Sequence, residues 1–224
     1  MRPICKGTEP EEFTLWKKGD SPDWNPGWSD FDGTAIKSKV KEALLQEQGY
    51  VCCYCEQRIE KADSHIEHLE SRHGTPQRSL DYTNILACCM REEPRVPRHC
   101  GSRKGDRTLK VSPLLPDCRE YFTFTGFGNV RPTDVPARRA MAEEAITIIG
   151  LDIAKLVTMR KRAVDGFIQA LAGVTPDQAR AVLARIDSRN AQGKNEPFAS
   201  AILSVLQPRP PAPTAPPTSS TPGT

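Results

Sequence analysis

The sequence contains no apolar segment long enough to cross a membrane. A transmembrane helix needs roughly 20 consecutive apolar residues, and charged residues interrupt the apolar stretches of this 224-residue chain well before that length. The first residues, Met-Arg-Pro-Ile-Cys-Lys, also lack the apolar centre of a secretion signal. We therefore expect a cytoplasmic protein that has no membrane partner.

A strong net charge is also missing. The formal charge is +3, with 38% hydrophobic, 26% charged and only 6% aromatic residues, a balance typical of a globular domain. Such a charge allows nucleic-acid binding without requiring it. Between positions 91 and 119, however, eight basic residues stand against four acidic ones. This surplus favours a polyanionic substrate, although a solvated loop would have the same composition.

Cysteine is the residue that stands out, with eight copies. Without an export signal we do not expect disulfides, and clustered cysteines in a reducing compartment indicate a metal site. The spacing Cys52-x-x-Cys55 lets two thiolates of one tight turn reach a single tetrahedral Zn²⁺. Cys100 and either Cys88 or Cys89 can complete the set. We predict a structural zinc on Cys52, Cys55, Cys88 and Cys100, against the alternative of buried free cysteines.

Inside this cysteine frame lie the residues that phosphodiester hydrolysis requires. The Glu67 carboxylate and the Asn84 amide oxygen are the kind of ligand that Mg²⁺ prefers, and Mn²⁺ would be held similarly. His68 has the near-neutral pKa of a general base for the attacking water. A regular strand would point Glu67 and His68 to opposite faces. We therefore expect the pair to lie where a strand ends or bulges.

The remaining chain reads mostly as helices. Residues 34–48 and the region after 136 carry apolar residues at helical spacing, Thr175 begins a capping box, and 121–131 is typical of a short hairpin. Proline and threonine dominate the end of the chain, which predicts disorder. We predict the α+β class for the protein as a whole. The predicted divisions are an N-terminal arm and helix over 1–49, a nuclease core over 50–132, a helical region over 133–206 and a disordered tail over 207–224.

The order of these motifs resembles the HNH nuclease superfamily. More closely, the chain is similar to the PtuB-type nuclease subunits of Septu and retron-linked anti-phage systems over about residues 2–170. The motifs that carry the resemblance are Cys52-x-x-Cys55, Ile66-Glu67-His68, Asn84-Ile85-Leu86, Cys88 and Cys100-Gly101-x-x-Lys104.

The resemblance implies a zinc-stapled ββα-metal core, with Glu67 and Asn84 as ligands of a catalytic Mg²⁺ or Mn²⁺ and His68 as general base. It also implies a role in defence against phage. The implied partners are nucleic acid, either DNA or RNA, and a PtuA-like ATPase of the SMC/ABC type, with a retron reverse transcriptase and its DNA as a further possibility. We expect residues 133–206 to dock the ATPase, with contacts from Phe198, Ile202 and Leu206.

One position departs from the family pattern. The last histidine of the common HNH motif falls where this sequence has Gly101, so a third metal ligand must come from elsewhere. Asp106 is the candidate, while Arg103 and Lys104 are candidates for phosphate contact. The alternative function is a zinc-finger-like nucleic-acid-binding module without catalysis. That alternative accounts for the cysteines and the basic loop, but it leaves Glu67, His68 and Asn84 unexplained.

Overall fold

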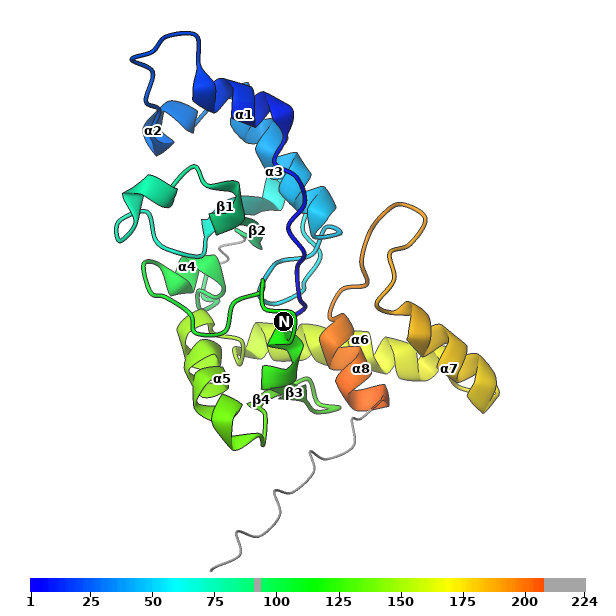
Figure 1. Ribbon diagram of the computed structural model, residues 1–224. Coiled ribbons are helices and arrows are strands. Elements are labelled where there is room, and N and C mark those ends of the chain that lie inside the picture. Colours follow the sequence, from blue (N-terminus) through cyan, green and yellow to red (C-terminus); the bar gives the residue numbers. More distant parts are fainter. Residues whose placement is uncertain (91–93, 208–224) are drawn as a thin grey trace, which may run out of the picture.

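A computed structural model describes residues 1–90 and 94–207 of the chain. The fold is a mixture of helices and two small sheets (Figure 1). The α-helices are α1 Glu11–Lys18, α2 Trp28–Phe31, α3 Ala35–Glu47, α4 Gly101–Lys104, α5 Pro136–Ile149, α6 Ala154–Ala170, α7 Pro176–Arg185 and α8 Ala199–Leu206. Single turns of 3₁₀-helix cover Lys61–Asp63, Pro76–Arg78, Tyr82–Asn84 and Cys118–Tyr121.

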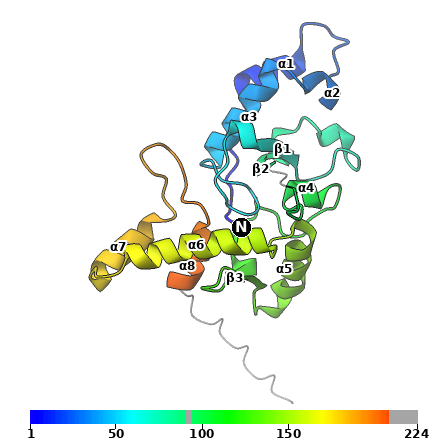
Figure 2. The ribbon, with the colours of Figure 1, turned by 180° about the vertical axis from the view of Figure 1, so that it is seen from behind.

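Each sheet is one antiparallel pair of strands. Strand β1 (Ser64–His68) pairs with β2 (Ile85–Cys89), so that Glu67 lies opposite Leu86. Strand β3 (Phe122–Phe124) pairs with β4 (Val130–Pro132) and confirms the hairpin expected near residues 121–131. The first hairpin lies between α3 and α4, near the middle of the molecule (Figures 1 and 2). The α+β class follows, and the sheet that matters for the site is the first one.

The N-terminal arm is more regular than the sequence indicated. Two helices, α1 and α2, interrupt the segment expected to be irregular, and they bury Phe13 and Phe31. Trp16 and Trp28 pack against the main core, while Trp24 stays 40% exposed. Helix α3 was predicted within one residue, because the Thr34 side chain caps its first turn and accepts a hydrogen bond from the Lys37 backbone.

The C-terminal helices begin and end at the capping signals in the sequence. Helix α5 ends at Gly150, which takes the left-handed conformation, and Thr175 caps α7 through the expected capping box. Helix α6 begins after Ile153.

The helical region after residue 133 is not detached from the rest of the fold. Ala145 and Ile149 of α5 lie in the same core as Leu44 and Leu86. The buried Arg160 side chain of α6 donates hydrogen bonds to the carbonyl groups of Gly128 and Leu151. A division at residue 132 therefore cuts through a shared core and does not separate two modules.

A second, smaller core forms between α6, α7 and α8. Phe198 and Ile202 are 6% and 0% exposed within it, packed with Val164 and Leu183. The expectation that Phe198 and Ile202 form a docking surface is therefore wrong, because their side chains already fill this core. The predicted disorder of the tail concerns residues that lie outside the described part of the chain, apart from Gln207. None of the described helices is long and apolar enough to span a bilayer.

A buried ion pair joins the two ends of the described chain to its centre. The Met1 ammonium group lies 3.0 Å from a carboxylate oxygen of Glu56, and both residues are buried. The other Glu56 oxygen accepts a hydrogen bond from the Ser200 backbone. Burial raises the pKa of Glu56, but the Met1 ammonium group, Ser200 and Arg119 lower it by more. The net result is a pKa of about 2, below the ordinary 4.5.

We predict that Glu56→Gln destabilises the fold by about 3–5 kcal/mol, because it leaves a buried ammonium group without its counter-ion. The carboxylate pKa is lowered on folding, so this stabilisation is complete above pH 4.5 and is lost as the pH falls through about 2. Thermal melts at pH 7 measure it in full. Glu143→Gln, at an exposed ion pair with Arg139, is the matched control and should change stability by less than about 0.5 kcal/mol. Equal melting temperatures for the two variants would contradict the prediction.

Candidate active site and cysteine cluster

Strand β1 positions the candidate catalytic residues through the alternation of its side chains between the two faces of the strand. Because side chains of a strand alternate between faces, His65 and Glu67 share one face of β1. His68 is the last residue of the strand, as the sequence required for a glutamate and a histidine that act together. The Nε2 atom of His65 lies 3.3 Å from Oε2 of Glu67.

Glu67 is a buried carboxylate whose two oxygens have different neighbours. Its Oε1 accepts a hydrogen bond from the Tyr54 hydroxyl at 3.1 Å and lies 3.1 Å from Nζ of Lys104, whereas Oε2 faces His65. Burial raises the pKa of Glu67, but His65 and Lys104 outweigh burial, so the pKa lies below its ordinary value. The carboxylate is therefore held charged and in one orientation.

His68 is held by its backbone surroundings in one tautomer. Its Nε2 lies 2.9 Å from the carbonyl oxygen of Ser79, and because a carbonyl only accepts, Nε2 must carry the proton. Nδ1 then keeps the lone pair. The ring of Trp28 packs edge-on against the imidazole at 4.6 Å, and the Arg72 guanidinium covers Trp28. Burial, followed by the nearby charges of Arg72 and Lys104, lowers the pKa of His68 despite the Ser79 bond and Glu67.

Asn84 organises the loop between the two strands. Its amide oxygen accepts a hydrogen bond from the Glu70 backbone N–H, and its amide nitrogen donates to the carbonyl groups of Glu70 and Arg78. Both halves of the amide are thus occupied by backbone. The metal-ligand role expected for Asn84 gains no geometric support, whereas a positioning role follows directly from these contacts.

Arg103, Lys104 and Asp106, the three site candidates after Cys100, lie in positions that differ from those predicted. Lys104 is 2% exposed, and its Nζ donates to the carbonyl of His68 at 2.8 Å besides pairing with Glu67. The predicted contact of Lys104 with a substrate phosphate is not supported, because the side chain is buried and already paired. Arg103 lies beside Gly150 at the end of α5. The exposed Asp106 carboxylate bonds with Ser71 and His73, and these contacts do not bring it to Glu67.

The cysteines gather into a buried cluster that could hold a zinc ion. The structure brings two overlapping groups of four side chains within 4.8 Å, and Cys89 and Cys100 belong to both. Sγ of Cys89 lies 3.6 Å from that of Cys52 and 4.0 Å from that of Cys55. Four sulfurs at tetrahedral positions around Zn²⁺, each with a bond of 2.3 Å, are separated by about 3.8 Å. The spacing fits a single ion.

Chemistry also favours a cation in the cluster. Burial raises the pKa of Cys55, Cys88 and Cys100 far above the ordinary 9.0, so several thiolates can coexist there only with a compensating positive charge. Of the two groups of close side chains, the one with Cys52 contains both Cys88 and Cys89. The group with Cys55 contains Cys89 but not Cys88. Between the two alternatives that the sequence left open, the geometry favours Cys89.

Several residues of the site were missed by sequence reasoning. His99 lies in the cluster, with Nδ1 3.3 Å from Sγ of Cys100. Tyr54 contacts Glu67, and Trp28 and Ser79 contact His68. His65 had a usable signal, because the two-residue period of a strand places it on the face of Glu67. The others depend on tertiary contacts that no local pattern encodes.

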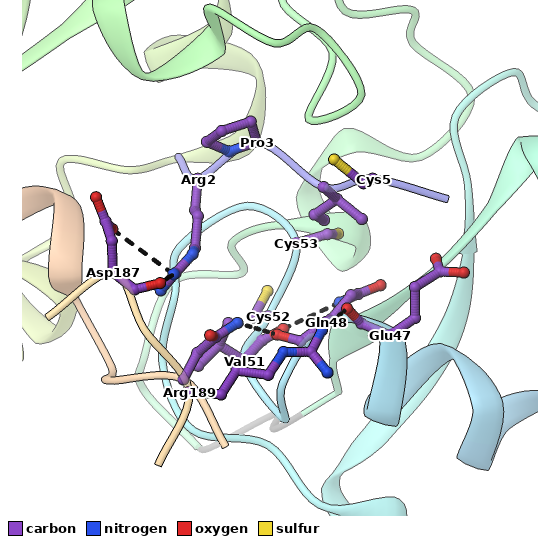
Figure 3. Close-up of a pocket in the computed structure, with 12 residues that line it drawn as sticks. Arg2, Pro3, Cys5, Glu47, Gln48, Val51, Cys52, Cys53, Asp187 and Arg189 are labelled. Carbon is purple, nitrogen blue, oxygen red and sulfur yellow. Dashed lines mark hydrogen bonds and ion pairs between the residues drawn. The ribbon is translucent and has the colours of Figure 1, made fainter. Parts of the chain in front are cut away.

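A pocket of about 210 Å³ lies away from Glu67 and His68 (Figure 3). It is lined by the N-terminal segment, by Cys52 and Cys53 and by the segment after α7, and Arg2 reaches Asp187 at one side of it. The candidate catalytic residues contribute nothing to its lining. The pocket is therefore separate from the Glu67–His68 site.

Comparisons with known proteins find two curated relatives. The chain is 28% identical over 147 residues to the "Retron Vc95 putative HNH endonuclease" of Vibrio cholerae, covering 63% of this chain and 70% of that protein. It is 29% identical over 154 residues to the "Retron Ec83 putative HNH endonuclease" of Escherichia coli, covering 55% of this chain and 58% of that protein, less than two thirds of the latter's length. A comparison with models of known families found no match. The chain is thus similar to two retron proteins that are named as putative HNH endonucleases.

We predict that Cys89→Ser removes most of the bound zinc and lowers the melting temperature, because it deletes a donor shared by both groups of the cluster. Cys88→Ser should retain zinc. Cys118→Ser is the control, since Cys118 is buried but contacts only backbone carbonyls of Met1 and Pro113 among its hydrogen-bond partners. Metal analysis of the purified proteins tests this, and zinc loss in Cys88→Ser with retention in Cys89→Ser would reverse the assignment.

Proposed function

We propose that the chain is a metal-dependent endonuclease that hydrolyses phosphodiester bonds. The observation that carries the proposal is the pair at the end of β1: a buried, charged Glu67 beside a neutral His68 whose Nδ1 lone pair is directed by the Ser79 hydrogen bond. The pair lies within a cysteine frame, in an antiparallel hairpin followed by the short helix α4. This arrangement supports a ββα-metal core with a structural zinc.

The residues divide the chemistry between them. Glu67 would hold the catalytic cation, Mg²⁺ or Mn²⁺, through Oε2. A divalent cation supplies stabilisation of the charge that grows on the phosphate and on the leaving oxygen. His68 accepts the proton of the attacking water at Nδ1, while the Ser79 carbonyl stabilises the imidazolium that results. Lys104 fixes both residues by binding Glu67 and the His68 carbonyl.

Asn84 acts in this proposal through the loop. By tying Glu70 and Arg78 together it places the Ser79 carbonyl, which follows Arg78 directly, against His68. Arg72, stacked on Trp28 next to His68, is the exposed cation at the site's edge and a more suitable phosphate contact than the buried Lys104. The substrate class that follows is nucleic acid, DNA or RNA.

We predict that His68→Ala reduces cleavage of nucleic acid by roughly 10²–10⁴-fold, the usual loss when a positioned base is removed. Nicking of plasmid DNA and of RNA in Mg²⁺ or Mn²⁺ measures it, with circular dichroism and zinc content as checks of the fold. His73→Ala is the matched control, because His73 is exposed and pairs with Asp106. Equal cleavage by His68→Ala and wild type would contradict the general-base role of His68, whereas no cleavage by wild type with any metal would favour the non-catalytic binding module.

The retron names of the two relatives extend the proposal to a system. We propose that the chain is the nuclease of a retron-linked or Septu-type anti-phage system and that it works with an SMC/ABC-type ATPase. The surface available for such a partner is the tip formed by the end of α6 and by α7, which projects away from the β1–β2 hairpin (Figures 1 and 2). Ile168, Val174 and Val182 are 48%, 37% and 42% exposed there. Exposed apolar side chains grouped at one tip favour a protein contact.

We predict that the double variant Ile168→Glu, Val182→Glu lowers co-purification of an ATPase encoded beside this chain by roughly tenfold, since an unpaired carboxylate buried at an apolar interface is costly. Leu15→Glu is the matched control, because Leu15 is 58% exposed on α1, which lies apart from α7 (Figure 1). Undiminished capture by the double variant would exclude this tip as the contact.

A further inference from the structure

We infer that His65 is a ligand of the catalytic cation, together with Glu67, and that Gly101 keeps the space between the two side chains open. The inference rests on the proposed nuclease function, since it names a further residue of that metal site. In the common HNH motif a histidine ligand lies at the position of Gly101, at the start of α4. Here the imidazole ligand would come from His65 on β1 instead.

The first support is the geometry of the two donor atoms. His65 and Glu67 project from the same face of β1, and Nε2 of His65 lies 3.3 Å from Oε2 of Glu67. Two donors that occupy adjacent positions around one ion, with bonds of about 2.1 Å, lie about 3.0–3.4 Å apart. The side chain of His65 is 26% exposed and that of Glu67 is 9% exposed. The pair is thus open to an ion on one side and backed by protein on the other.

The second support is the orientation of the Glu67 carboxylate. Tyr54 and Lys104 both bind Oε1, each at 3.1 Å. Their contacts leave Oε2 as the oxygen that faces His65. A carboxylate whose one oxygen is held by the protein presents the other as a preorganised donor. The direction of that donor is toward the imidazole.

The third support is the glycine itself. A Cβ atom built on Gly101 would lie 2.3 Å from Oε2 of Glu67 and 2.7 Å from Nε2 of His65. Both distances are far inside van der Waals contact, so a side chain at position 101 and the present His65–Glu67 arrangement exclude one another. The Gly101 backbone N–H donates to Sγ of Cys88, which holds the glycine against the pair. A histidine on α4 and a histidine at position 65 are therefore alternative solutions to the same ligation problem.

The other candidates for this ligand are engaged elsewhere. The Asp106 carboxylate bonds with Ser71 and His73, and both halves of the Asn84 amide bind backbone groups. His99 lies in the cysteine cluster. The chain has four histidines in total, and His68 points its Nε2 at the Ser79 carbonyl. His65 is the histidine whose ring nitrogen lies against the glutamate.

Mn²⁺ binding to the zinc-loaded full chain tests the inference without any assay of activity. Pulsed EPR of bound Mn²⁺ should show ¹⁴N modulation from a directly bound imidazole, and His65→Ala should abolish it and weaken Mn²⁺ binding by about tenfold or more. Gly101→Ala should weaken binding as well, because its Cβ fills the space between the donors. His68→Ala and His73→Ala should each keep both the modulation and the affinity.

Wild-type protein labelled with ¹⁵N-histidine provides evidence that does not depend on a variant's folding. The ¹⁴N modulation should be replaced by ¹⁵N coupling, and its survival in His68→Ala and His73→Ala assigns it to His65, since zinc occupies the cluster that contains His99. Absence of histidine coupling in wild-type protein, or unchanged coupling and affinity in a folded His65→Ala variant, would overturn the inference. Failure of the proposed nuclease function appears differently, as Mn²⁺ binding with histidine coupling but no cleavage of nucleic acid by wild-type protein.

Discussion

The candidate site depends on one buried cation. The Nζ atom of Lys104 lies 3.1 Å from Glu67 and 2.8 Å from the carbonyl oxygen of His68, so a single ammonium group fixes a side chain and the main chain at the end of β1. Its own backbone belongs to α4, which begins directly after Cys100. The helix, the strand end and the cysteine cluster are thereby joined, and loss of one partner of such a buried pair typically costs about 3–5 kcal/mol.

The cysteine cluster performs the same kind of joining on a larger scale. It brings together the turn at Cys52–Cys55, the end of β2 and the segment that leads into α4. None of these pieces is long enough to form a stable unit alone, since a two-stranded hairpin is marginal in water. The Met1–Glu56 ion pair, adjacent to the turn, connects the same region to α8 through Ser200. The helices after residue 133 therefore complete the core that supports the site.

Features that depend on local sequence signals were predictable, whereas features that depend on tertiary contacts were not. Helices α3, α5 and α7 were predictable because their caps and apolar periods are local, and the Glu67–His68 pair was recognisable by its residue types. The burial of Lys104 was not, since a lysine in a basic loop normally points to solvent and only the buried Glu67 opposite it reverses this preference. Phe198 and Ile202 were misread for the converse reason: an apolar helix face looks the same from sequence whether its own core or a partner covers it.

Lys104 also has an electrostatic consequence for the proposed metal site. Its positive charge offsets the negative charge of Glu67 and, together with the hydrogen bond from His65, keeps the pKa of the buried carboxyl below its ordinary value. The same charge weakens the attraction that this carboxylate exerts on a cation, because the two effects act over nearly the same distance. An uncharged donor beside Glu67, as His65 provides, adds a ligand without adding a negative charge that Lys104 would cancel. In the proposed nuclease, the substrate phosphate would supply further negative charge to the bound cation. Substrate binding would therefore strengthen cation binding, and the cation would strengthen substrate binding.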